Sequence, residues 1–246
     1  MDRLIYEQHA ALERDHWWFV SRREILRRLL SENLPPSADR RILDVGCGTG
    51  GMLPMLSHFG DVAGLDSDPE AVAACHERFP SYKVSRAEIP KDMPDYSSFD
   101  LVSAFDVIEH IADDLGAVRS LRDATRPGGQ VVITVPAHAW LWSRHDVANG
   151  HHRRYGRSRL ADLVGAAGLE LSHLSSFNTA LLPLIGAIRL SRRLRRQPPG
   201  TGSDFTMPSP WLNAALTRLM SAEAPLVARR GLPTGVSLVA LARRPA

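Results

Sequence analysis

The feature that most constrains this chain is residues 41–51, Arg-Ile-Leu-Asp-Val-Gly-Cys-Gly-Thr-Gly-Gly. An apolar run ends in a glycine cluster, and the mostly apolar residues 52–59 follow it. That order predicts a buried strand, a tight turn and a helix, which together form the first unit of an open α/β sheet. Glycine is favoured where the backbone turns sharply or where a ligand approaches it with no Cβ in the way.

The glycine cluster alone has two interpretations. Gly46, Gly48 and Gly51 fit the G-x-G-x-x-G pattern of dinucleotide-binding loops, which is a weak signal by itself. Asp44, two residues before Gly46, is expected to direct its carboxylate into the loop, where it would repel a pyrophosphate. The same carboxylate attracts a ligand with an ammonium group. S-adenosylmethionine (SAM) carries an ammonium, a sulfonium and ribose hydroxyls, and it has no phosphate.

Four segments in chain order resemble the motifs of class I SAM-dependent methyltransferases. They are Asp-Val-Gly-Cys-Gly-Thr-Gly at 44–50, Val-Ala-Gly-Leu-Asp at 62–66, the run from Ser98 to His110, and Arg-Pro-Gly-Gly at 126–129 with the strand that follows. His-Trp-Trp-Phe at 16–19 is similar to an element of a bacterial subgroup related to ubiquinone-type O-methyltransferases. The resemblance implies a methyltransferase that uses SAM and releases S-adenosyl-L-homocysteine.

The resemblance implies an α/β fold with a Rossmann-like, seven-stranded, mostly parallel sheet and helices on both faces. The last strand is expected to be antiparallel, with a helical insertion before it. We expect an N-terminal helical cap at 1–34, a SAM-binding core at 35–177, an inserted lid or membrane-interface region at 178–233 and the final strand at 234–246. Patterning predicts helices over 2–14, 52–59, 68–79, 111–125, 156–168, 178–188 and 211–229, a turn at 126–129, and strands over 61–66, 82–85, 100–105, 130–135, 169–177 and 235–242.

The same resemblance implies a set of cofactor-binding residues. Asp66 is expected to hold the ribose hydroxyls. Arg86 stands where related chains carry an acid for the adenine amino group, so Glu88 or the Ala87 backbone is expected to serve instead. The predicted set is Asp44, Gly46, Cys47, Gly48, Gly50, Asp66, Ser67, Ala87, Glu88, Phe105 and Asp106, with Trp18 and Arg22 from the N-terminal helices.

A second element, Gly-His-His-Arg-Arg-Tyr at 150–155, matches the subgroup after the fifth strand and is expected to overhang the methyl donor. A hydroxyl acceptor must lose its proton during attack, and a histidine with a pKa near neutrality suits that role. We predict His151, His152 and Tyr155 as catalytic candidates, with His151 favoured as the base, and His145 and His110 are further candidates for that role. The predicted acceptor-binding residues are His110, Arg153, Arg154 and Trp140, although helix capping or ion pairing explains the arginines equally well.

The inserted region suggests the kind of acceptor. Residues 180–196 form an apolar stretch that ends in clustered arginines, as in helices that lie at a membrane surface. The alternative is a lid that packs on its own domain. We therefore expect a small or lipid-linked acceptor and a cytoplasmic location, with or without peripheral attachment to the inner face of the membrane.

Composition and the remaining motifs narrow the alternatives. A formal charge of +3 is too small to indicate nucleic acid, and two cysteines fit a reducing compartment. Met1-Asp2-Arg3 does not open a signal peptide, no apolar run suits a membrane span, and no metal site or nucleophilic triad is predicted. A nicotinamide-dependent oxidoreductase that uses the same loop and a non-catalytic SAM-binding module stay as alternatives. The oligomeric state stays open.

Overall fold

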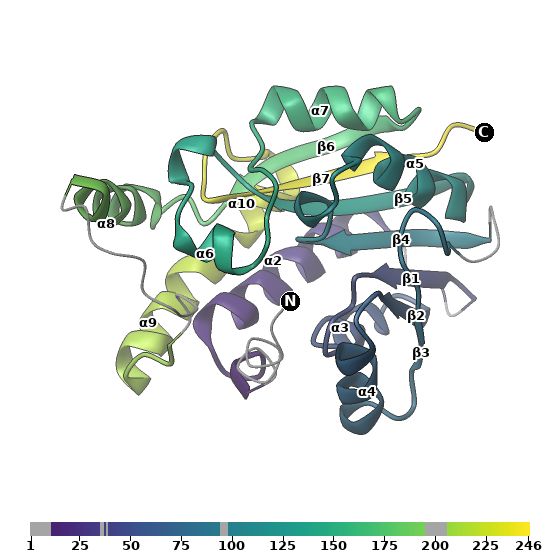
Figure 1. The fold of residues 1–246 in the computed structure, drawn as a ribbon, viewed down its shortest axis with the longest axis horizontal. Coiled ribbons are helices and arrows are strands. Elements are labelled where there is room, and N and C mark those ends of the chain that lie inside the picture. The colour runs from purple at the N-terminus through teal and green to yellow at the C-terminus, as the bar shows by residue number, and fades with distance from the viewer. Residues whose placement is uncertain (1–10, 35–36, 38, 94–97, 195–205) are drawn as a thin grey trace.

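The protein, described here by a computed structural model over residues 11–34, 37, 39–93, 98–194 and 206–246, is built on one seven-stranded sheet (Figure 1). The strand order is β3-β2-β1-β4-β5-β7-β6; β1 to β5 pair in parallel, and β7 is antiparallel to both β5 and β6. The strands are β1 Arg41–Val45, β2 Asp61–Asp66, β3 Lys83–Arg86, β4 Phe99–Phe105, β5 Thr125–Pro136, β6 Glu170–Phe177 and β7 Ser237–Arg243. The predicted fold class is confirmed.

Helices cover both faces of the sheet, and successive residues of a strand point to opposite faces and pack against different helices. Ile42 packs with α2 and α10, whereas the next residue, Leu43, packs with α5 and α7. This arrangement explains why the inner strands β1 and β4 are buried along almost their whole length, since a parallel sheet with helices on both faces is buried on both sides. The helices are α2 Trp17–Asn33, α3 Leu53–Leu56, α4 Pro69–Arg78, α5 Asp114–Ala124, α6 Arg144–Ala148, α7 Arg157–Ala166, α8 Leu182–Leu194, α9 Pro210–Ser221 and α10 Ala224–Arg229, with short 3-10 helices η1 Ile108–His110 and η2 Ala139–Leu141.

The register of the parallel strands brings acidic residues to one edge. Asp44 pairs with Gly64 of β2 and with Ser103 of β4, so β1, β2 and β4 end side by side. The strand order reverses between β1 and β4, and ligands of such sheets bind outside the carboxyl ends of the strands at that reversal. In Figure 1, α6, α8 and α9 gather at this same end of the molecule.

Several helix boundaries differ from those predicted. The helix expected over 2–14 falls largely on residues outside the described part, and residues 13–15 form a turn. The helix expected from 111 begins only at Asp114, because the Asp113 carboxylate accepts the Gly116 N–H at 2.8 Å and caps it. The helix expected over 211–229 is two helices, α9 and α10, separated at 222–223.

The turn predicted at 126–129 is part of β5 instead. Thr125 already pairs with Phe99, and the register then shifts before Leu101 pairs with Gln130. The Gly128 backbone has a φ of +76°, which glycine adopts without strain. The Arg-Pro-Gly-Gly sequence therefore makes an irregularity within the strand rather than a break before it.

The segment between β6 and β7 packs two of its helices, α9 and α10, against the N-terminal helix α2. Trp17 N–H of α2 donates to Asn213 Oδ1 of α9 at 2.8 Å, and the Ser21 hydroxyl reaches the Thr217 carbonyl at 3.3 Å. The segment 180–196, predicted to touch a membrane or a lipid, is helical over α8, while 195–196 fall outside the described residues. Within the described part of the chain, no helix combines the length and apolar character needed to cross a membrane.

Candidate active site

A cavity of about 910 Å³ opens at the carboxyl ends of the parallel strands. Its walls come from the glycine loop, the residues after β2, β3 and β4, the N-terminal end of α2, the segment 145–154 and α8. Of the predicted site residues, it contains Trp18, Arg22, Asp44, Gly46, Cys47, Gly48, Asp66, Ser67, Ala87, Glu88, Phe105, Asp106, His110, His151 and Arg154.

The glycine loop is shaped by close packing on one side and open space on the other. Gly46 has a φ of +69°, and a Cβ there would overlap the Val107 side chain. Gly48 has a φ of +55° and lines the cavity, where a Cβ would meet nothing within 4 Å. The Asp66 carboxylate accepts the Gly48 N–H at 2.8 Å and the Asp68 N–H at 2.9 Å, so the acid at the end of β2 holds the loop.

Asp44 is a buried acid at the edge of this cavity. It is 2% exposed, and its Oδ1 accepts the Ser103 hydroxyl at 2.6 Å. Burial raises the pKa of Asp44 to about 7, against the opposing effects of the Ser103 hydrogen bond and of Arg22. The carboxylate therefore gains most from a ligand that brings a positive charge into the cavity.

The N-terminal helix contributes an ion pair and an aromatic stack. Arg22 Nη2 lies 2.8 Å from Asp106 Oδ2 and 3.1 Å from the Thr134 hydroxyl. The Trp18 ring stacks on Phe177 with 6.0 Å between centroids. Arg22 thus reaches the cavity wall, where it is already paired with the acid that follows β4.

Glu13 is a contact of the glycine loop that was not predicted. Its Oε2 accepts the Thr49 hydroxyl at 2.9 Å and lies 2.6 Å from Arg78 Nη1. A Cβ on Gly51 would lie 2.6 Å from the Glu13 Cδ, so the two segments are in close contact. No local pattern reveals this partner, because the N-terminal turn reaches the loop only through the tertiary fold.

Asp146 organises the segment that carries His151. It is 0% exposed, and its carboxylate accepts hydrogen bonds from His151 Nδ1 at 3.0 Å, Arg154 Nε at 2.6 Å and the Ser143 N–H at 2.7 Å. Burial alone would raise the pKa of Asp146, but the bonds from His151 and Arg154 outweigh it and hold the pKa below its usual range. With Nδ1 engaged, Nε2 is the His151 nitrogen left for other partners.

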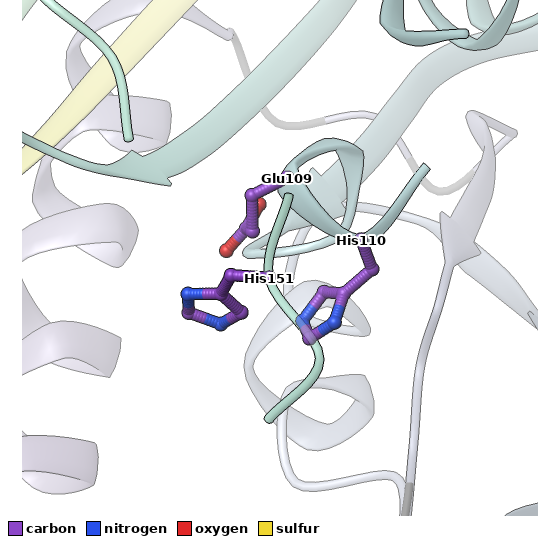
Figure 2. A group of neighbouring side chains, drawn as sticks. All are labelled: Glu109, His110 and His151. Atoms are coloured by element: carbon purple, nitrogen blue, oxygen red, sulfur yellow. The ribbon is translucent and has the colours of Figure 1, made fainter. Parts of the chain in front are cut away.

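The side chain of His151 also lies close to those of Glu109 and His110. Glu109, His110 and His151 each offer one ligand atom, and these atoms lie within 4.8 Å of one another (Figure 2). The His110 and His151 rings are perpendicular, with centroids 4.6 Å apart. Burial, together with the neighbouring His151, lowers the pKa of His110 to about 4, which leaves that ring neutral near pH 7.

Glu109 is the member of this group that sequence analysis did not single out as a site residue. It is 0% exposed, and neither carboxylate oxygen has a hydrogen-bond partner among the described residues. Burial, with a further contribution from Asp106, raises the pKa of Glu109 well above its usual value. A buried carboxyl without partners at a cavity wall is unusual and indicates a place for a ligand.

Five predicted site residues do not line the cavity. Tyr155 is fully buried and donates its hydroxyl to Asp114 Oδ2 at 3.0 Å, and Arg153 Nη1 lies 2.8 Å from the same carboxylate oxygen. His152 is exposed and Trp140 is 51% exposed. The fifth is Gly50, where a Cβ would lie 2.5 Å from Cys75 Sγ. We assign Tyr155, Arg153, His152 and Trp140 no part in the chemistry proposed below.

Comparisons with known proteins identify relatives along most of the chain. A family model described as a methyltransferase domain matches residues 18–174. A probable S-adenosylmethionine-dependent methyltransferase of Mycolicibacterium smegmatis is 28% identical over 95% of this chain and 91% of its own length. A ubiquinone biosynthesis O-methyltransferase of Pseudomonas aeruginosa is 30% identical, but only over 39% of this chain and 44% of its own.

Solved structures match the fold. A putative methyltransferase of Haloferax volcanii, solved in complex with the activator Trm112, superposes with a TM-score of 0.64. The match covers 98% of this chain and 95% of that one at 18% sequence identity. At that identity the likeness concerns the fold alone.

Proposed function

This chain belongs to the methyltransferase domain family and is a SAM-dependent methyltransferase, and we propose that it methylates an oxygen atom of a small or lipid-linked acceptor. The observation that carries the proposal is the Asp146–His151 dyad, with 3.0 Å between Oδ1 and Nδ1. His151 lines the same cavity as the acids Asp44 and Asp66. A neutral imidazole fixed by a carboxylate is suited to accept a hydroxyl proton.

The residues of the cavity fit the cofactor. Gly48 lines the cavity and leaves the space beside its backbone open, and the buried carboxylate of Asp44 suits the ammonium of SAM. Asp66 lies at the end of β2, and each of its carboxylate oxygens accepts one backbone N–H and has a second lone pair with which we propose that it accepts a ribose hydroxyl. We propose that Cys47, Ser67, Ala87, Glu88, Phe105, Trp18 and Arg22 complete the binding site.

Each part of the chain then has a defined task. When bound, SAM would supply a methyl carbon on a sulfonium, whose C–S electron pair would leave with sulfur as the C–O bond forms. His151 accepts the hydroxyl proton on Nε2, and Asp146 stabilises the imidazolium that results. Arg154 shares the Asp146 carboxylate and keeps it ionised. Holding acceptor and donor in line can supply about 7–11 kcal/mol of the barrier.

Apolar residues of α8 and its surroundings line one side of the cavity, and we propose that this side holds an apolar part of the acceptor. Ile185 and Ile188 of α8 and Pro208 line it. Leu184, on the same helix, is 57% exposed, and Trp211 at the start of α9 is 73% exposed. An acceptor that joins a hydroxyl head to an apolar tail would place the head near His151 and the tail along α8.

A product analysis tests the proposal. The protein is incubated with methyl-labelled SAM and matched acceptors that differ in one group, for example a phenol, an aniline and a carboxylic acid that carry the same alkyl tail. We expect label in an O-methyl product of the hydroxyl acceptor, with turnover rising as the tail lengthens. Label transferred only to nitrogen or carbon would contradict the oxygen assignment.

The two alternatives from sequence are not supported by the comparisons, whose named relatives here are methyltransferases. Isothermal titration with SAM and with NAD measures the choice directly, because an oxidoreductase would bind NAD. A protein that binds SAM but gives no product with any acceptor would be the non-catalytic module.

A further inference from the structure

The Glu109, His110 and His151 group has a rigid backbone frame. Glu109 and His110 belong to η1, which follows β4, and His151 comes from the segment after α6. The two segments are joined directly, because the His152 N–H donates to the Glu109 carbonyl at 2.8 Å. Figure 2 shows the three side chains turned toward a common space.

The charges around this group leave Glu109 uncompensated. Two arginines act on its carboxylate, but each has a closer acid of its own. Arg22 lies 2.8 Å from Asp106, and Arg154 lies 2.6 Å from Asp146. Ionising a buried carboxyl without a partner costs on the order of several kcal/mol, so the site favours a ligand that brings positive charge and displaces the carboxyl proton.

His151 also has the environment of a metal ligand. Its Nδ1 is bonded to the fully buried Asp146, which fixes the ring and leaves Nε2 for a further partner. Metal-binding histidines almost always hydrogen-bond a carboxylate or carbonyl through the second nitrogen, which orients the ring and raises its basicity.

We propose that Glu109, His110 and His151 bind one divalent transition-metal ion, with an open coordination position facing the cavity. Two imidazole nitrogens and one carboxylate oxygen are the donors of open catalytic Zn²⁺ sites and of facial Fe(II) sites. Mg²⁺ prefers oxygen ligands alone and is not expected to bind here. Ligands of Zn²⁺ lie at about 2.0–2.2 Å from the ion. Binding one ion would therefore require small side-chain rotations that bring the three ligand atoms closer together.

The inference rests on the proposed function and changes one role in it: an acceptor hydroxyl in the open position would become more acidic on the metal and lose its proton to water in the cavity, with His151 acting as a ligand instead of a base. His151 cannot accept a proton on the nitrogen that ligates the metal, so the two proposals differ in a measurable way. If the chelator-treated protein keeps its O-methylation and binds no Zn²⁺, the metal proposal fails and the proposed function stands. If the protein binds Zn²⁺ but gives no O-methyl product, the metal proposal stands and the O-methylation proposal fails.

The test is calorimetric titration of ZnCl₂ into chelator-treated protein, with Glu109→Gln and His110→Ala as ligand variants and His152→Ala as the matched control. We expect one Zn²⁺ per chain. Loss of an outer partner of a ligand costs about 10–100-fold in metal affinity, so Asp146→Asn should weaken binding by that amount and Glu109→Gln by more. His152→Ala should bind as the unmodified protein does, since that side chain is exposed and does not line the cavity.

Folding and geometry need their own readouts. Circular dichroism and SAM affinity, both measured without metal, show whether a variant that fails to bind Zn²⁺ is still folded. Co²⁺ in place of Zn²⁺ should give the visible absorption of a site with nitrogen and oxygen ligands. Absence of saturable binding by the unmodified protein, or a folded Glu109→Gln protein that binds Zn²⁺ as tightly, would overturn the proposal.

Discussion

The Nδ1 atom of His151 lies 3.0 Å from the Oδ1 atom of Asp146, and this contact decides which face of the imidazole is available. The backbone reinforces it, because the His151 N–H donates to the Asp146 carbonyl at 2.9 Å. Both residues therefore move as one unit, and the orientation of the ring does not depend on a bound ligand. The unit is the basis of the first two predictions.

Replacing His151 with glutamine should remove the proton acceptor and keep much of the side-chain volume. We expect kcat to fall by about 10²- to 10⁴-fold, the usual contribution of a general base. SAM affinity should change little, because the acids and glycines that we propose to hold the cofactor are untouched. Steady-state methyl transfer and calorimetric SAM binding measure the two quantities.

The matched control for this substitution is His76→Gln. His76 is an exposed histidine of α4, away from the cavity lining. Its replacement should leave both kcat and SAM affinity as they are. Turnover that survives in His151→Gln would assign the proton to another group.

Replacing Asp146 with asparagine should affect activity and stability together. Arg154 would stay buried without its charged partner, which costs about 3–5 kcal/mol of unfolding free energy. The second substitution Arg154→Met should restore much of that stability, because it removes the buried charge that has lost its partner. It should not restore kcat, since the imidazole still lacks its carboxylate. Chemical denaturation and kinetics separate the two effects, and recovery of both would make Asp146 merely structural.

The central part of the fold could be predicted because its signals are local. The strand predicted over 61–66 coincides with β2, and Asp68 caps α4 as expected, its carboxylate accepting the Glu70 N–H at 2.9 Å. Such features depend on periodicity and on residues within one turn of each other. The same reasoning wrongly predicted a turn for Arg-Pro-Gly-Gly at 126–129, because pairing with β4 and β7 outweighs the turn preference of Pro and Gly.

The partners of the site could not be predicted, because they come from remote parts of the chain. The sequence shows Glu109 next to His110, but nothing local places His151 beside them. Likewise, Tyr155 looked available for chemistry until the fold brought Asp114 to its hydroxyl. Charge and residue type indicate which side chains can do chemistry, whereas the crossings of the chain decide which of them meet.

Comparing two glycines with the same backbone φ distinguishes the cost of a steric clash from the cost of backbone strain when each is replaced by alanine. Gly46 and Gly150 both have a φ of +69°, but a Cβ would overlap Val107 at Gly46 and meet nothing within 4 Å at Gly150. Gly150→Ala should cost about 1–2 kcal/mol of unfolding free energy from the left-handed conformation alone. Gly46→Ala should cost about 1–3 kcal/mol more from overpacking. Equal losses in denaturant titrations would contradict the close contact at Gly46.

The last prediction concerns the pH dependence of SAM binding. The pKa of Asp44 is raised to about 7, so in the free protein the carboxyl gains its proton as the pH falls through that value. The ammonium of SAM favours the ionised form, so binding at lower pH must release the proton. We expect SAM affinity to fall by about tenfold per pH unit well below pH 7. Titration calorimetry in buffers of different ionisation enthalpy should detect the proton released.

Asp44→Asn should bind SAM weakly and without this step. Asp66→Asn should also bind weakly but keep the step, because Asp44, the group whose proton the step reports, is intact. A pH step that persists in Asp44→Asn would show that another group titrates, and the charge assigned to Asp44 in selecting the methyl donor would then be wrong.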